Sequence, residues 1–154
     1  MRVEFINPFL TATQNVFSTM LGCTLARGPL QLKHDAPVHE VSGMIGLSGR
    51  CRGMVMVSMG RDTALAAAGA LLGTRPADLN GDVLDAVGEL TNMIAGAAKS
   101  QLEEYRLSIG LPTVICGMVH SIKFPPGATP IVIPFDCSLG PVSVEVGLVE
   151  SPQS

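Results

Sequence analysis

Two polar residues in the middle of the chain, Glu89 and Asn92, are candidates for a functional site because of their side chains and their separation along the chain. A carboxylate carries negative charge and accepts hydrogen bonds, whereas a carboxamide both donates and accepts them. The two positions are three residues apart, so on a helix their side chains are neighbours on one face. Asp85, one turn before Glu89, extends the same polar strip.

Two glycines, Gly88 and Gly96, fall beside these polar side chains. Glycine inside a helix costs roughly 1 kcal/mol relative to alanine, and an ordinary solvated face does not need it. Next to a carboxylate and an amide, the glycines would let the backbone of another protein come close. They could equally allow tight packing of the helix, and glutamate with asparagine at this spacing occurs on many exposed helices. The spacing alone therefore does not identify an enzyme.

A long helix must position these residues. It is predicted to begin at Asn80 and to run to about Leu107, where Gly110 and Pro112 stop it. On a helical wheel, one side is apolar and the opposite side polar. The apolar side carries Val83, Ala86, Val87, Leu90, Met93, Ile94, Ala97 and Ala98, and the polar side carries Asp85, Glu89, Asn92, Lys99, Ser100 and Glu103.

The remaining pattern predicts two shorter helices and five strands. Asn7 is the expected N-cap of the first helix, Pro8 its first residue and Gly22 its end. A second helix is expected at 61–72, and strands are expected at 38–47, 50–59, 113–124, 131–137 and 142–149. Short turns join the strands, which favours antiparallel pairing. We expect an α+β fold, forming a single domain over residues 1–154.

Composition narrows the class of protein. Of the 154 residues, 47% are apolar and 15% charged, which indicates a globular core and not a disordered chain. The net charge of -3, without a cluster of Lys and Arg, gives no pull toward nucleic acid. The sequence contains no run of about 18 apolar residues, so no membrane span is predicted. The amino end lacks a signal-peptide pattern, so the expected location is the cytoplasm.

The usual metal and catalytic motifs are not present. The four cysteines are far apart without a CxxC pair, and the three histidines form no HExxH. We therefore expect reduced core thiols and no metal site. The sequence also contains no GxxxxGK[ST] and no GxSxG, so other common enzyme classes have no support.

The segment Asp85–Gly96 resembles the signature helix of the CheC/CheX chemotaxis phosphatases, D/S-x-x-x-E-x-x-N. The opening Phe5–Phe9 and the stretch Leu111–Gly117 are similar to the same family, so the resemblance covers almost the whole chain in order. Members of the CheC type carry two such signatures. Here the first helix has Gln14 and Asn15 but no ExxN, which resembles the single-site CheX members.

The resemblance implies a function and a set of roles. The expected activity is hydrolysis of the aspartyl phosphate on a CheY-type response-regulator receiver domain, which ends a chemotaxis signal. Asn92 would hold the attacking water, and Glu89 would pair with a lysine of the receiver. Gly88 and Gly96 would permit close approach, and Asp85 would either help docking or offset the helix dipole. The chain would bind no cofactor itself, since the receiver supplies Mg²⁺, and it would form a homodimer. Residues 140–149 are one candidate for an edge strand in that dimer.

Two other readings stay open at this stage. The chain could be a CheX-like module that binds receiver domains or flagellar-switch components without catalysis. It could also be a structural homodimerisation domain whose helix face is merely solvated.

Overall fold

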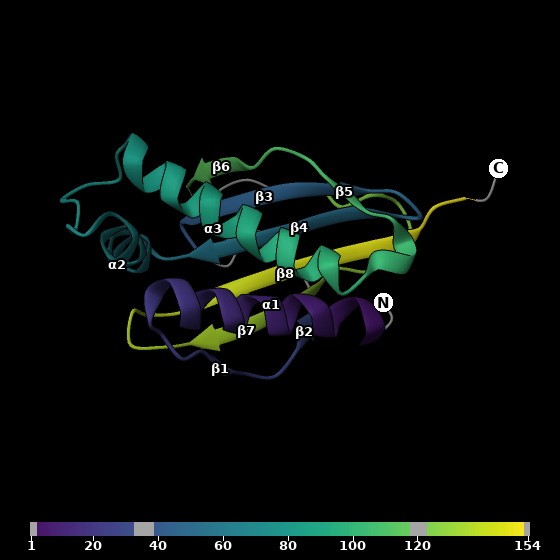
Figure 1. Cartoon of the computed structure of the whole chain (residues 1–154), viewed down its shortest axis with the longest axis horizontal. Coiled ribbons are helices and arrows are strands. Elements are labelled where there is room, and N and C mark those ends of the chain that lie inside the picture. The colour runs from purple at the N-terminus through teal and green to yellow at the C-terminus, as the bar shows by residue number, and fades with distance from the viewer. Residues whose placement is uncertain (1–2, 33–38, 118–122, 153–154) are drawn as a thin grey trace.

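The protein is one antiparallel sheet covered on one face by helices (Figure 1). The computed structural model describes residues 3–32, 39–117 and 123–152. In chain order the elements are α1 (Val3–Leu21), β1 (Ala26–Arg27), β2 (Gln31–Leu32), β3 (Val41–Ser48), β4 (Cys51–Met59), α2 (Arg61–Leu72), α3 (Gly81–Ser100), the 3₁₀ helix η1 (Glu103–Tyr105), β5 (Ser108–Ile109), β6 (Thr113–Cys116), β7 (Ile131–Asp136) and β8 (Val142–Glu150). The predicted α+β class is confirmed.

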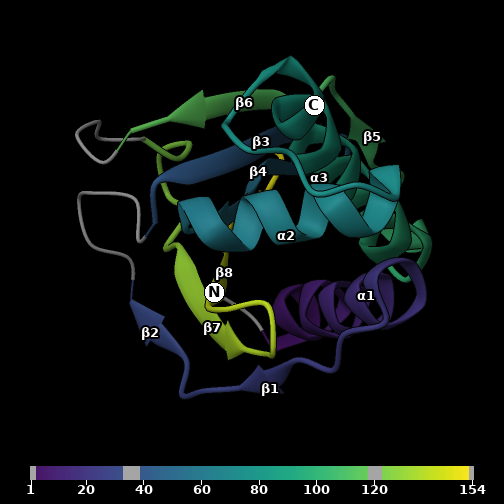
Figure 2. The ribbon, with the colours of Figure 1, turned by 90° about the vertical axis from the view of Figure 1, so that its left-hand side faces the viewer.

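The sheet has eight strands in the order β1-β7-β8-β4-β3-β5, with β2 also on β7 and β6 also on β3. Every described pair is antiparallel, and β4 with β8 forms a long ladder from Cys51–Glu150 to Met59–Val142. Figure 2 places β6 and β2 at opposite ends of the sheet. The candidate edge at residues 140–149 is wrong, because β8 lies between β4 and β7 and both of its sides are already paired.

The helical layer packs on the face to which the odd-numbered residues of β4 point. Val55, Val57 and Met59 on that face are fully buried, and so are the even-numbered valines of β8. Helices α1 and α3 lie side by side over the sheet, with α2 against α3 (Figure 1). The core is built mainly from aliphatic side chains, as the scarcity of aromatic residues predicts. In the described ranges, no helix is both long enough and apolar enough to cross a membrane.

Helix α1 begins earlier than the sequence predicts. It starts at Val3 and contains Pro8, so Asn7 is not its N-cap. Proline inside a helix loses one hydrogen bond and crowds the preceding turn, at a cost of about 3 kcal/mol. The extra turn buries Phe5 and Ile6, which are 3% and 5% exposed. Burying two large apolar side chains contributes roughly as much as the proline costs. Gly22, with φ of 63°, ends the helix as predicted.

Helix α3 ends at Ser100, not near Leu107. The next residues turn into η1, and the Arg50 N–H donates to the Tyr105 carbonyl at 2.8 Å. The Tyr105 ring packs edge-on against Phe5, with ring centroids 5.2 Å apart. These long-range contacts hold residues 103–105 against the β3–β4 turn and against α1. If α3 continued straight, these residues could not reach either contact.

The predicted strand at 113–124 is also shorter. Strand β6 ends at Cys116, and Gly117 follows with φ of 125°, a conformation that favours glycine. Residues 118–122 of that prediction lie outside the described residues, as does Val38 of the predicted strand 38–47. Strands β1, β2 and β5 each have two residues, too few to leave a periodic signal in the sequence.

One glycine in β3 lets α3 approach the sheet. A Cβ atom on Gly43 would overlap the hydroxyl of Thr91, which is fully buried and donates to the Val87 carbonyl at 2.8 Å. We expect Gly43→Ala to lower the free energy of unfolding by about 1–3 kcal/mol, the usual range for overpacking. Urea denaturation measures the change.

The matched control is Gly46→Ala on the same strand, where an added Cβ meets no atom within 4 Å. Its effect on stability should be much smaller than that of Gly43→Ala. Removing the hydroxyl as well, with Thr91→Ala, should recover part of the loss, because the two changes act on one contact. Equal stability of the two single glycine variants would show that the approach of α3 to β3 is not close.

Candidate functional site

Helix α3 holds the candidate site on a well-anchored scaffold. The Asn80 side chain caps the helix by accepting the Val83 N–H at 3.1 Å, and Asp82 lies in the first turn, where negative charge is favourable. Val83, Leu90 and Ile94 are fully buried. The predicted apolar side of the wheel is therefore the core side, and the opposite side of the helix is presented to solvent.

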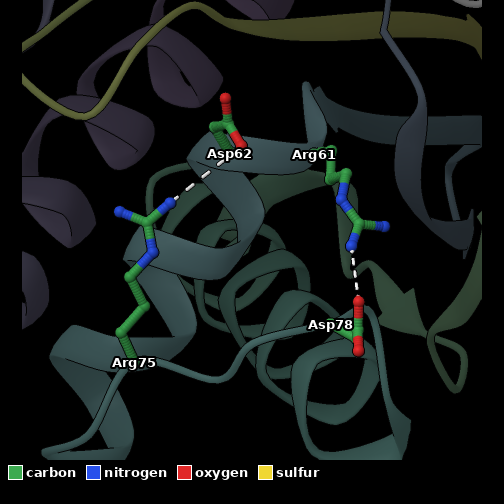
Figure 3. Close-up of polar contacts among 4 residues, drawn as sticks. All are labelled: Arg61, Asp62, Arg75 and Asp78. Atoms are coloured by element: carbon green, nitrogen blue, oxygen red, sulfur yellow. Dashed lines mark hydrogen bonds and ion pairs between the residues drawn. The ribbon is translucent and has the colours of Figure 1, made fainter.

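Two ion pairs accompany the turn that leads into α3. Arg61 Nη2 lies 2.8 Å from Asp78 Oδ1, and Arg75 Nη2 lies 4.0 Å from Asp62 Oδ1 (Figure 3). All four side chains are open to solvent, from 42% for Arg61 to 92% for Asp62, so each pair contributes little to stability. They link the start of α2 to the connection before α3.

Glu89 and Asn92 lie next to each other on the outward side of α3, as the spacing predicts. Glu89 and Asp85 are exposed, and Asn92 is half-buried. Among the residues that the structure describes, neither Glu89 nor Asn92 has a side-chain hydrogen bond or an ion pair. Their polar atoms are therefore available to an incoming molecule. The structure thus brings together Asp85, Glu89 and Asn92.

The two glycines of this helix have different surroundings. A Cβ on Gly88 would lie 3.4 Å from Val114 Cγ2 and 3.7 Å from Pro112 Cβ, and Gly88 is buried. It therefore packs against the chain's own β6 side, which is the tight packing that the sequence left open as an alternative. Gly96 is half-buried, and an added Cβ there would meet no atom within 4 Å. Only Gly96 leaves open space beside the polar strip.

A hollow of about 490 Å³ continues from Gly96 past the end of α3. Its lining includes Lys99, Glu103, Arg106 and Ile109, so its wall is both charged and apolar. Sequence reasoning did not find this hollow, because it depends on the early end of α3 and on the return of the chain through β5.

The chemistry that these groups can perform is hydrogen bonding and charge pairing. The Asn92 amide can orient a small polar molecule, and the Glu89 carboxylate can pair with a cation. Within the described ranges, no group of three or more His, Cys, Asp or Glu side chains gathers where it could hold a metal ion.

The cysteines are free thiols in different surroundings. Cys23 and Cys51 are buried, as expected of core thiols, and Cys137 is half-buried. Burial, with a hydrogen bond involving Cys23, raises the pKa of Cys137 to about 11, so its thiol is protonated near neutral pH. Cys116 is exposed, which corrects the expectation that all four are core residues.

His39 belongs to a polar cluster on the sheet face opposite the helices. Its Nε2 atom lies 3.3 Å from Ser143 Oγ, and its backbone N–H donates to Ser58 Oγ at 3.1 Å. Ser58 and Ser143 are buried. Burial lowers the pKa of His39 from its usual value of 6.5, and the Asp136 carboxylate opposes part of that shift.

The lowered pKa of His39 predicts a pH-dependent stability. The unfolded chain binds the proton of His39 more tightly than the folded chain does. The contribution of neutral His39 to the free energy of unfolding is therefore complete above pH 6.5, and it is lost as the pH falls toward the folded-state pKa. In urea titrations at several pH values, His39→Gln should therefore flatten this part of the profile. If the stability profiles of the natural protein and His39→Gln run parallel between pH 5 and 7, the lowered pKa of His39 is contradicted.

Comparison with known proteins gives one consistent result. The family model described as "Chemotaxis phosphatase CheX" matches residues 41–136. The "CheY-P phosphatase CheX" of Thermotoga maritima is 29% identical over 127 residues, which cover 80% of this chain and 82% of that protein.

Two solved structures extend this likeness over nearly the whole chain. A chemotaxis protein CheX from Desulfovibrio desulfuricans is 36% identical, with a TM-score of 0.86, and the match covers 96% of this chain and 100% of the other. In the CheX-CheY-BeF3-Mg+2 complex from Borrelia burgdorferi, the matched chain is 26% identical with a TM-score of 0.83, covering 97% and 100%. The site described above lies inside the matched region.

Proposed function

Because this chain belongs to the chemotaxis phosphatase CheX family, we propose that it hydrolyses the aspartyl phosphate of a CheY-type receiver domain. The observation that carries the proposal is the pair of unpartnered polar side chains, Glu89 and Asn92, side by side on the outward face of α3 in the described part of the chain. The names of the Thermotoga and Borrelia relatives support the same reaction and the same kind of partner.

Asn92 positions the attacking water. The amide hydrogen-bonds the water and places it in line with the phosphorus, opposite the bond to the receiver aspartate. The water oxygen forms the new P–O bond and the bond to the aspartate oxygen breaks, which releases inorganic phosphate and a free carboxylate. An amide is a poor base, so the contribution of Asn92 is positioning, with the charge stabilised by the Mg²⁺ that the receiver holds.

Glu89 orients the partner. Its exposed carboxylate meets a lysine of the receiver as a charge-assisted pair, which fixes the receiver against α3. Asp85, one turn earlier and also exposed, extends the acidic strip toward the partner. Gly96 leaves room for a close approach of the partner backbone. Gly88 is buried beneath Pro112 and Val114, so its proposed role is now to let α3 lie close to its own sheet edge.

The decay of a phosphorylated receiver domain, with Mg²⁺ present, tests the proposal. The natural protein should accelerate phosphate release above the spontaneous rate, and catalytic amounts should turn over many receiver molecules. Binding to the phosphorylated receiver without acceleration would support the non-catalytic module. Neither binding nor acceleration, across the receivers of the source organism, would favour the structural domain. The homodimer that the resemblance implies and the cytoplasmic location expected from the amino-end sequence remain predictions.

A further inference from the structure

Leu111 is the most exposed large apolar side chain in the described ranges, with 90% of its surface open to solvent. The next most exposed are Val3 and Leu32, at 65% and 64%. Single exposed apolar side chains are common on proteins and need no special explanation. Leu111 is of interest because of its position relative to α3.

The backbone on both sides of Leu111 is fixed to β3. Ile109 pairs with Leu47, the Gly110 N–H donates to the Gly46 carbonyl at 3.0 Å, and Thr113 pairs with Met44. Only Leu111 and Pro112 lie between these anchors, and proline has a restricted φ. The leucine is therefore held outward by a pinned backbone, which reduces the entropy that would be lost on binding.

This segment runs along the flank of α3 in the opposite direction to the helix. Pro112 lies against Gly88, and Ile109 shares the hollow with Gly96 and Lys99. Leu111 comes between Ile109 and Pro112, so it lies beside the stretch of α3 between Gly96 and Gly88. Asn92 is the midpoint of that stretch. An exposed apolar side chain thus stands next to the proposed catalytic face.

We propose that Leu111 is a docking residue, which inserts into an apolar spot on the receiver domain beside its phosphorylated aspartate. The inference rests on the proposed function, since the receiver that covers Glu89 and Asn92 would also cover the adjoining flank. Glu89 and Asp85 supply charge to the contact, and charge complementarity across an interface sets orientation and specificity more than raw affinity. A leucine that loses its water contact on docking supplies affinity.

Leu111→Ser tests the inference in steady-state phosphatase kinetics with increasing phosphorylated receiver. We expect KM to rise about tenfold, the effect of losing one buried leucine contact. The value of kcat at saturation should change by less than about twofold, because Asn92 and Glu89 are untouched. Binding to a receiver held in its active form by beryllofluoride should weaken by the same factor. Leu111→Met, which keeps the apolar surface, should behave like the natural protein.

Leu32→Ser is the matched control, since Leu32 is 64% exposed on β2, at the opposite end of the sheet (Figure 2). It should leave KM and binding unchanged. If the natural protein dephosphorylates the receiver and Leu111→Ser has the same KM and affinity, the docking role alone is overturned. A natural protein that neither binds nor dephosphorylates any receiver would overturn the docking role and the proposed function together.

Discussion

Asn92→Ala should slow the hydrolysis of the receiver phosphate by about 10²-fold at saturating receiver, since misplacing a reacting group can cost this much in rate. The Asn92 amide lies on the outward face of α3 and can both donate to and accept from a water molecule. Alanine leaves that water without a fixed position, while the receiver and its Mg²⁺ still stabilise the transferring phosphate. The loss should therefore appear in kcat, with little change in KM.

Asn92→Ala should fold normally, so its loss of activity can be assigned to the reaction. Asn92 is half-buried, and in the described residues its side chain makes no hydrogen bond that alanine would remove. Alanine is also the better helix former, so the melting temperature should be equal or slightly higher. Asn15→Ala is the matched control, because Asn15 is exposed on α1 and should be silent in the assay. Full activity of Asn92→Ala would remove Asn92 from the reaction.

The features that sequence reasoning predicted are those set by local periodicity. The two faces of α3 follow from the spacing of Val83, Leu90 and Ile94 against Glu89, because a helix repeats every 3.6 residues wherever it lies. The resemblance then added roles that spacing could not supply, and the family comparison supports it. The order of helices and strands was readable for the same local reason.

The features that it missed depend on contacts between distant segments. Pro8 lies inside α1 because the turn before it packs into the core. No local sequence pattern reveals that packing. Strand β8 has Ser143 and Glu145 on one face, and both are buried, which their polar residue types do not indicate. Gly88 is covered by Pro112, a contact that the spacing alone could not select over an open surface. In each case the surroundings, and not the residue type, decide the exposure.

The structure also separates two kinds of residue on α3. Thr91 and Gly88 face the sheet and fix where the helix lies, through contacts with Gly43 on β3 and Val114 on β6. Glu89 and Asn92 face outward, where we propose that they act on the receiver. Adjacent positions therefore have different tasks, and variants should differ accordingly. Changes at Thr91 or Gly88 should affect stability first, whereas changes at Glu89 or Asn92 should affect the reaction with stability kept.

Glu89→Ala should weaken the reaction at low receiver concentration by roughly 30-fold, because truncating one partner of a desolvated charge pair costs at least about 2 kcal/mol. The carboxylate is exposed and unpartnered in the described part of the free chain, so the effect arises only in the complex. Unlike Asn92→Ala, this variant should bind the activated receiver more weakly as well as turn it over more slowly, since the same pair holds and orients the receiver.

Two comparisons identify the charge as the cause of the Glu89 effect. Glu89→Gln keeps the shape but removes the charge, so it should lose most of what Glu89→Ala loses, and added salt should reduce the difference from the natural protein. Glu104→Ala removes an exposed carboxylate from η1, outside the α3 strip, and should leave kcat/KM unchanged. Equal losses for Glu104→Ala and Glu89→Ala would point to the general negative charge of the protein. Unchanged affinity and rate in Glu89→Ala would eliminate the pairing role, and Asn92 would then act on a receiver oriented by other contacts, with Leu111 the first to test.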